Sequence, residues 1–293
     1  MSRKLILFMA AALSTLAGCV PKMAEPLAVC PGKISTADAL AVLRSRSQNI
    51  VPFRASGQGH LTYYVEGKKK PQSESIDVKL WVNPPMEIYL QGDKPLIAKA
   101  VVLGSNEHEF WLAVSPKEIS LYCWGEWSQQ NSSEGPAINP RTLLEALGIG
   151  EAETSEGWPA TRTAGWSLSN KGAFDILTKQ EQGVITKKMY IYSCDYRVRK
   201  IEFFGVAGGV VARAELEDYR EASNGFFVPA MIKITTQGRG RIEDSLSITL
   251  DLASIKPADI AEPQRKYLFE RRPPQGFKHV HRIVNGKWVE EPQ

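Results

Sequence analysis

The fold is decided by the stretch Ile76-Asp77-Val78-Lys79-Leu80-Trp81-Val82, in which an aliphatic residue stands at every second position. Successive side chains of a β-strand point to opposite faces, so this pattern predicts a strand with one apolar face. Pro84 and Pro85 follow and end the strand. A strand of this kind needs neighbours to bury its apolar face, and the surrounding sequence supplies them.

The same alternation recurs on both sides of this stretch, with turn residues between short apolar-rich segments. The predicted strands cover residues 53–66, 76–82, 86–91, 97–103, 109–114, 119–124, 174–179, 185–194, 198–205, 210–219, 226–236 and 243–252. Strands that recur at this spacing are typical of a continuous antiparallel meander. We therefore expect a mainly β (α+β) domain with one sheet of about 10–12 strands.

Two segments are predicted as helices, over residues 35–48 and 139–148. In the second, Asn139 caps the helix, Pro140 takes the first helical position and Gly148 ends it. Its leucines form an apolar face over two turns. A helix this short is not stable alone, so we expect it to pack across the sheet.

The N-terminus has the pattern of a secretory signal. Positive charge at Arg3 and Lys4 precedes an apolar run that is shorter than the ~20 residues needed to span a bilayer. The run ends in Leu16-Ala17-Gly18-Cys19, which resembles the bacterial lipobox. The resemblance implies cleavage after residue 18 and lipidation of Cys19, which would be the membrane attachment. The alternative is an ordinary cleaved signal in which Cys19 has no role.

The rest of the chain divides into three parts. Residues 19–34 contain several prolines and are predicted to form a lipidated tether, and residues 35–270 form the folded domain. Residues 271–293 form a C-terminal extension, in which the pair Asn285-Gly286 predicts a hairpin. Pro257, Pro263, Pro273 and Pro274 predict that extended coil dominates the C-terminal segment, including the end of the folded domain. By the sorting rule of enterobacterial lipoproteins, Val20 after the cysteine implies the outer membrane, facing the periplasm.

Charge and motifs argue against several classes of function. Without Arg3 and Lys4 the chain has 34 basic and 32 acidic residues, so nucleic-acid binding is not expected. The four histidines form no ligand pair at helical spacing, and we find no nucleophile elbow or phosphate-binding loop. We therefore expect a monomer that is not an enzyme, with no catalytic residue, metal site or cofactor.

Three cysteines remain once Cys19 is lipidated. An odd number in an oxidising compartment allows at most one disulfide and leaves one free thiol. Cys123 and Cys194 both fall in predicted strands, so a bridge across the sheet is one alternative. Cys30 follows the tether and can instead reach either of the other two.

The order of these features resembles the periplasmic lipoprotein-carrier and outer-membrane lipoprotein-receptor (LolA/LolB-like) superfamily. The resemblance covers about residues 35–270 and is carried by residues 109–125, by the helix at 139–148 and by the late strand at 227–234. Members fold as an incomplete antiparallel barrel, in which helices plug an apolar concave face that holds acyl chains. The resemblance therefore implies a single incomplete antiparallel β-barrel with two helices packed on its concave face.

Candidate lipid contacts are the apolar residues at alternate strand positions and on the second helix. They are Val78, Leu80, Ile88, Leu90, Phe110, Leu112, Leu143, Leu147, Ile232 and Ile234. The alternative is that these residues form a filled core without a cavity. The aromatic residues Trp81, Tyr89, Trp111, Tyr122 and Trp124 have the opposite parity. They form either an exposed partner or membrane surface, or one side of a sheet that is covered on both faces.

We therefore expect a membrane-anchored lipoprotein whose concave face binds acyl chains or a lipidated protein, in lipid or lipoprotein handling at the cell envelope. The alternative is a structural or assembly lipoprotein that binds another envelope protein and carries no lipid. One feature departs from the family. Its receptor inserts a hydrophobic loop residue into the membrane, whereas the loop expected here, residues 66–72, is basic and polar.

Overall fold

The computed structural model of the chain describes residues 27–64, 70–115, 120–129, 140–149, 165–205, 207–236, 246–284 and 287–291. The sequence predictions that lie outside the described residues are the signal peptide, the lipobox with Cys19, the Asn139 cap and the turn at Asn285-Gly286. Most of the loop at residues 66–72 also lies outside them.

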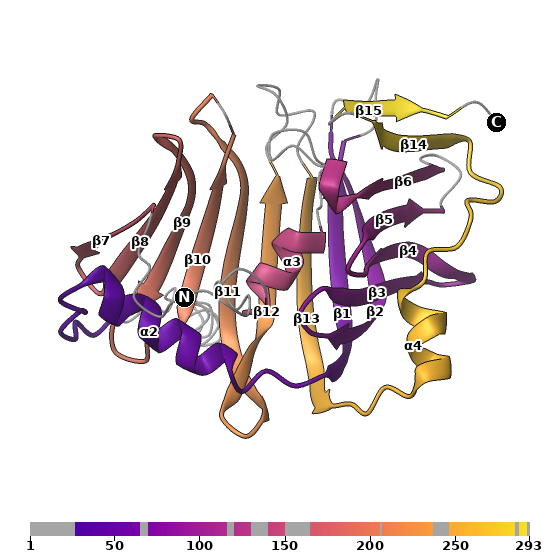
Figure 1. Cartoon of the computed structure of the whole chain (residues 1–293). Helices are drawn as coiled ribbons and strands as arrows, with labels where there is room; N and C mark the ends of the chain where they lie inside the picture. The colour runs from indigo at the N-terminus through magenta and orange to yellow at the C-terminus, as the bar shows by residue number, and fades with distance from the viewer. Residues whose placement is uncertain are drawn as a thin grey trace, which may run out of the picture.

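One open sheet dominates the described chain (Figure 1). Its strands are β1 (Phe53–Tyr63), β2 (Gln72–Asn83), β3 (Glu87–Lys94), β4 (Ile97–Ser105), β5 (Glu109–Val114), β6 (Leu121–Glu126), β7 (Trp166–Lys171), β8 (Phe174–Glu181), β9 (Val184–Tyr192), β10 (Val198–Phe204), β11 (Val210–Ser223), β12 (Phe226–Thr236), β13 (Leu246–Pro257), β14 (His279–Val284) and β15 (Lys287–Glu290). The helices are α2 (Thr36–Ser47), α3 (Pro140–Ala146) and α4 (Glu262–Phe269), with a 3-10 turn η1 (Trp127–Gln129).

The strand order is β15-β14-β6-β5-β4-β3-β2-β1-β13-β12-β11-β10-β9-β8-β7. All neighbours are antiparallel except β14 and β6, which are parallel. The sheet does not close, because β15 and β7 lie at its two ends. The expected mainly β fold, an incomplete antiparallel barrel with helices, is thus confirmed.

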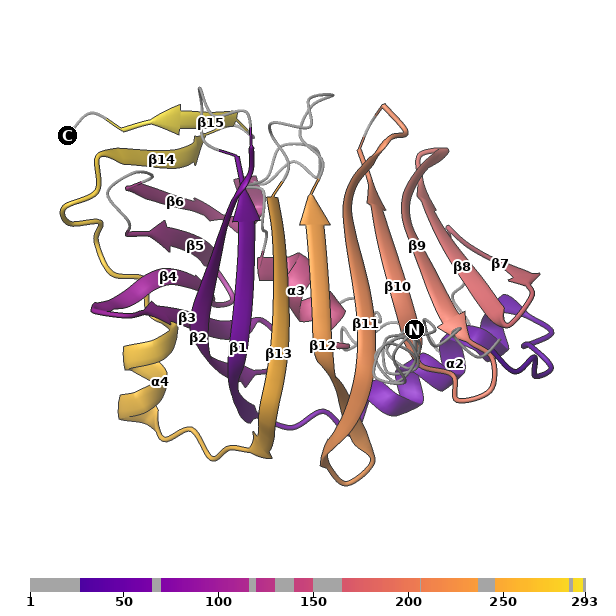
Figure 2. The ribbon, with the colours of Figure 1, turned by 180° about the vertical axis from the view of Figure 1, so that it is seen from behind.

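The first strand of the chain, β1, lies in the middle of the sheet. β1 pairs with both β2 and β13, although β13 lies almost two hundred residues further along the chain. After β6 the chain crosses to β7 at the opposite end of the sheet and then returns strand by strand to β13. α3 belongs to this crossing and contacts β4, β11 and β12. Its position in front of the sheet in Figure 1, and behind it in Figure 2, follows from this route.

The described chain has fifteen strands rather than the expected 10–12. β7 was missed because only Trp166 of its six residues is buried, so its sequence shows no clear alternation. The C-terminal hairpin, β14 and β15, is the other addition. It does not hang free, because His279 to Arg282 pair in register with Leu121 to Trp124 of β6.

The helix α4 is a second correction, since prolines in this region predicted extended coil. Pro263 stands in the first turn, where a proline is tolerated because the backbone N–H has no partner within the helix. Leu268 and Phe269 are buried at the end of the helix. The Arg265 guanidinium holds the helix to β3 through two hydrogen bonds of 2.9 Å to the Glu87 carboxylate.

Both faces of the sheet are covered over strands β3 to β6. We call the face that carries α2 and α3 the concave face, and the face that carries α4 the convex face. On the convex face, Tyr89, Trp111 and Tyr122 form a cluster with Leu268 and Phe269 of α4. Of the two interpretations of the opposite-parity aromatic residues, a sheet covered on both faces is therefore correct for these three.

The cysteines are also settled by the fold. Cys30 and Cys194 form the disulfide, and Cys123 is a buried free thiol. β9 ends at Tyr192, so Cys194 lies in the turn after the strand and not within it. The proposed bridge between Cys123 and Cys194 is wrong.

Candidate functional site

A cavity of about 280 Å³ lies on the concave face, between α2, α3 and strands β9 to β12. Its apolar lining comes from both helices and from the sheet. The apolar residues are Leu40, Leu43, Ala146, Trp166, Met189, Val198, Ile201, Leu216, Phe226 and Phe227. The cavity is therefore a hollow in the interface between the helices and one half of the sheet.

Local periodicity places these side chains. Leu40 and Leu43 stand three residues apart on α2, so they share one face of the helix. In the sheet, Met189 of β9 pairs directly with Ile201 of β10, which puts both side chains on the concave face. The Ser35 side chain accepts a hydrogen bond from the backbone N–H of Asp38 and caps the start of α2.

A buried ion pair forms part of the wall. The Lys187 Nζ of β9 lies 2.6 Å from Glu145 Oε2 of α3, and both side chains are less than a tenth exposed, at 7% and 8%. Burial of two charges is costly unless they pair closely, and this distance is that of a charge-assisted hydrogen bond. The pair leaves the inner part of the wall without net charge.

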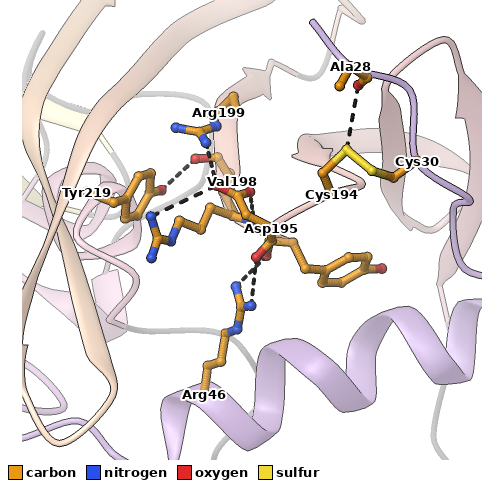
Figure 3. Close-up of polar contacts among 10 residues, drawn as sticks. Ala28, Cys30, Arg46, Cys194, Asp195, Val198, Arg199 and Tyr219 are labelled. Carbon is orange, nitrogen blue, oxygen red and sulfur yellow. Dashed lines mark hydrogen bonds and ion pairs between the residues drawn. A yellow bond between two sulfur atoms is a disulfide. The ribbon is translucent and has the colours of Figure 1, made fainter.

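Arginine side chains gather where α2 meets the turn between β9 and β10. Arg46 of α2 donates to the backbone oxygens of Asp195, at 2.7 Å, and Tyr196, at 2.6 Å (Figure 3). Partial desolvation, followed by the neighbouring positive charge of Arg197, lowers the pKa of Arg46 below its ordinary value. Arg44 and Arg197 also line the cavity.

Tyr219 of β11 supports this cationic region from the sheet. Its hydroxyl donates to the backbone oxygen of Val198, and burial raises the pKa of its phenol. The Arg197 guanidinium lies 4.2 Å from the centre of the Phe227 ring and 5.4 Å from that of Tyr219. These rings hold the cation by its flat face.

The segment before α2 is attached to the same part of the sheet. Besides the Cys30–Cys194 disulfide, the backbone N–H of Lys33 donates to Asp175 Oδ2 at 2.8 Å. Asp175 is completely buried and also accepts from the Asn170 amide at 2.7 Å. Residues 30–33 of the predicted tether are therefore part of the domain.

The ten candidate lipid contacts lie elsewhere on the concave face. All ten are buried, from 0% exposed for Leu80 to 7% for Leu112. All but Phe110 belong to one hydrophobic cluster that includes the leucines of α3. None is among the residues that line the cavity. They pack as a filled core here, and their contact with lipid remains a prediction.

Sequence reasoning missed the cavity residues for a physical reason. Arg46 and the backbone it binds are separated by about 150 positions, and the two come together only when α2 docks beside the turn at 193–197. A lone arginine at a helix end gives no signal of such a partner. Alternation along a strand predicts which side chains face inward, but it does not distinguish a filled site from a hollow one.

One exposed apolar residue has an unusual backbone. Leu96, at the tip of the β3–β4 hairpin, is fully exposed and has φ +66. The left-handed region is uncommon for a large side chain, and the following residue, Ile97, is also exposed. The hairpin therefore presents two aliphatic side chains to its surroundings.

Within the described residues, no helix is long and apolar enough to cross a membrane. The same part of the chain contains no group of three or more His, Cys, Asp or Glu side chains that could hold a metal ion.

Comparison with known proteins gives structural likeness only. No protein-family model matches the chain, and no curated protein matches it. A domain described as an outer membrane lipoprotein-sorting protein from Vibrio parahaemolyticus aligns at 11% identity and TM-score 0.48, over 78% of this chain and 94% of that one. A LolA superfamily protein from Nitrosomonas europaea aligns at 11% identity and TM-score 0.47, over 79% and 97%. A DUF1329 family protein from Desulfovibrio piger aligns at 11% identity and TM-score 0.47, over 79% of this chain and 95% of that one. Likeness at this level assigns no residue role.

Proposed function

We propose that the protein binds an acyl chain, belonging to a lipid or to a lipidated protein, in the cavity between α2, α3 and β9 to β12. The observation that carries the proposal is the cavity itself, with apolar side chains from two helices and five strands around a volume of about 280 Å³. Ligand pockets usually have about 300–1,000 Å³. The volume of this cavity lies just below that range, which suits one chain rather than several.

The hydrophobic effect supplies the driving force. Each methylene group moved from water into an apolar site contributes ~0.8 kcal/mol. Few polar groups compete inside, because Lys187 and Glu145 satisfy each other. A longer chain would have to enter the region now filled by α3. In that event α3 moves, and the ten candidate residues become the contacts for the inner part of the chain.

The site would work at a membrane of the cell envelope, by our proposal the outer membrane facing the periplasm. Lipidated Cys19 would hold the chain there. The disulfide at Cys194 would bring the tether to the cavity, since Asp195, the next residue, accepts from Arg46. Leu96 and Ile97 would provide a second, weaker membrane contact.

The alternative is an assembly lipoprotein that carries no lipid. One observation that favoured it, a surface of exposed aromatic residues, is absent for three of these residues. Tyr89, Trp111 and Tyr122 are covered by α4 and offer no aromatic docking surface. The two end strands, β7 and β15, remain available as edges for a protein partner.

Lipid extraction tests the proposal. The variant Cys19→Ala, secreted and purified without detergent, is expected to release an acyl-chain compound that mass spectrometry detects. Leu43→Trp places an indole in the cavity and should abolish this signal. Leu168→Trp is the matched control, because Leu168 packs in the same cluster but does not line the cavity. Protein that carries no chain and takes up no fluorescent fatty acid would refute the proposal.

A further inference from the structure

We propose that the ligand is an anionic amphiphile, with its acyl chain in the cavity and a carboxylate or phosphate headgroup held by Arg46 and Arg197. This inference rests on the proposed function and adds the chemical class of the ligand. It is carried by the distribution of charge around the cavity.

The lining has a surplus of positive charge. Among the lining residues that the structure describes, Arg44, Arg46, Lys187 and Arg197 are cationic, and Glu145 is the one carboxylate. Arg44 has a partner of its own, which leaves Arg46 and Arg197 as the cations that can face a headgroup. Glu145 is already paired with Lys187, so it does not neutralise the arginines. A cavity that served a neutral or cationic ligand would not need this surplus.

The nearest further carboxylate does not cancel it. Asp195 accepts from the Arg199 guanidinium at 2.5 Å and from the backbone N–H of Arg197 at 3.0 Å. The Arg197 guanidinium is 3.9 Å away from the same carboxylate. One acid thus serves two arginines, and Figure 3 shows Arg199 and Arg46 on either side of Asp195.

Arg46 is the arginine best placed for a headgroup. It is exposed, and it donates hydrogen bonds to two backbone oxygens, which carry no net charge. Those two bonds fix the guanidinium at the end of α2 while leaving further N–H groups. A positioned guanidinium loses little entropy when it binds an anion, which favours bidentate recognition of a carboxylate or phosphate.

The paired charges and the arginine charges lie at different depths in the cavity. Lys187 and Glu145 are buried and mutually neutral, whereas Arg46 is exposed and Arg44 and Arg197 are half-buried. An amphiphile with its headgroup outward and its chain inward matches this gradient. Its anion would also relieve the repulsion between Arg46 and Arg197, the second cause of the lowered pKa of Arg46.

Four ligands with a ten-carbon chain test the proposal on the Cys19→Ala protein, by displacement of the neutral fluorescent probe N-phenyl-1-naphthylamine. They are decanoate, decyl phosphate, decanol and decyltrimethylammonium. We expect the two anions to bind roughly tenfold tighter than decanol, as charge-assisted hydrogen bonds allow, and the cation to bind most weakly. The preference should shrink at high salt, because the arginines are partly exposed. The two anions compared with each other distinguish a carboxylate from a phosphate headgroup.

Arginine variants provide the second arm. Arg46→Gln and Arg197→Gln should each lower the affinity for decanoate severalfold while the affinity for decanol stays the same. Arg199→Gln is the control, since Arg199 binds Asp195 but does not line the cavity. Decanol thus reports that the cavity is intact.

The outcomes separate the two proposals. Equal binding of all four ligands overturns the anionic headgroup and leaves acyl-chain binding in place. Loss of decanol together with decanoate in both variants also overturns it, because the arginines would then only hold the fold. Displacement by none of the four ligands overturns both proposals.

Discussion

Lys187 Nζ and Glu145 Oε2 lie 2.6 Å apart, and this buried ion pair joins β9 to α3 at the wall of the cavity. The two residues are 42 positions apart in sequence and belong to elements that share no backbone hydrogen bond. The pair is therefore a specific link between the crossing segment and the sheet.

Removal of one partner of this ion pair should lower the free energy of unfolding strongly, whereas removal of both partners should lower it little. Glu145→Gln leaves the Lys187 ammonium buried without its counter-charge, which is expected to lower the free energy of unfolding by about 3–5 kcal/mol. The double variant Glu145→Leu with Lys187→Met should recover most of this loss. Urea denaturation of the unchanged protein, of Glu145→Leu and Lys187→Met alone, and of the double variant measures the coupling. Equal destabilisation by the single and double changes would contradict a coupled pair.

The Cys30–Cys194 disulfide should stabilise the whole domain and fix residues 27–34. It closes a segment with a sequence separation of 164, so its loss is expected to lower stability by about 2–5 kcal/mol. The double variant Cys30→Ser with Cys194→Ser should also speed amide hydrogen exchange at Lys33, whose N–H binds Asp175. Unchanged exchange at Lys33 would show that Asp175 holds the segment by itself.

Cys123 should be inert in the folded protein. Burial raises the pKa of its thiol to about 12, so almost no thiolate is present near neutral pH. In the Cys19→Ala protein we expect no reaction with a disulfide reagent at pH 8, and one reactive thiol after unfolding in guanidinium. Rapid reaction of one thiol in the native protein would contradict the burial of Cys123, and reaction of three thiols would refute the assigned bridge.

The same burial should make stability depend on alkaline pH. In the folded state Cys123 and Tyr122 both have pKa values raised to about 12, by burial. A raised pKa favours the protonated form in the folded state, so this stability is complete below the unfolded pKa values of about 8.5 and 10 and is lost as pH rises toward 12. Cys123→Ala should flatten the early part of the decline in urea midpoints. An identical decline in this variant would exclude Cys123 as a cause.

Gly104 should not tolerate a side chain. A Cβ at this position would lie 2.3 Å from two ring carbons of Trp111, its partner across the β4–β5 pair. Because Trp111 packs beneath α4, Gly104→Ala is expected to lower stability by about 1–3 kcal/mol. Gly209→Ala is the control, since a Cβ there meets no atom within 4 Å. Thermal unfolding of the two variants makes the comparison.

Leu96 should contribute to membrane contact. Transfer of one leucine side chain from water contributes roughly 1.5–3 kcal/mol, so Leu96→Ser is expected to weaken vesicle binding of the Cys19→Ala protein about tenfold. Val184→Ser, at an exposed position of β9, is the control. Sedimentation with vesicles measures both. Equal binding by the Leu96→Ser variant would remove the hairpin from the proposed membrane surface.

The strand pattern could be predicted wherever alternation is strong. Ile76, Val78, Leu80 and Val82 alternate with polar or aromatic positions, and all four are buried in β2. Prediction was incomplete at the two ends of the sheet and at α4. There, short elements have few buried residues of their own and are stabilised by strands far away in sequence.

The sequence predicted that the candidate site is an apolar face of the sheet, but it did not predict the residues that line the cavity. Sequence alternation indicated an apolar concave face, but the ten residues chosen from it fill a core beside the cavity. The cavity and its arginines depend on where α2 and α3 dock. Docking brings Arg46 to Asp195 and Glu145 to Lys187, and local periodicity contains no information on such distant pairs.

The sequence by itself therefore determined the class of fold and the faces of most strands, because side-chain direction in a strand follows from a period of two that any short window contains. The tertiary structure alone decided the disulfide partner of Cys30, the burial of Tyr89 and Trp111 under α4, and the hollow beside Arg46. Each of these depends on contacts between segments that the chain brings together only after it has crossed the sheet.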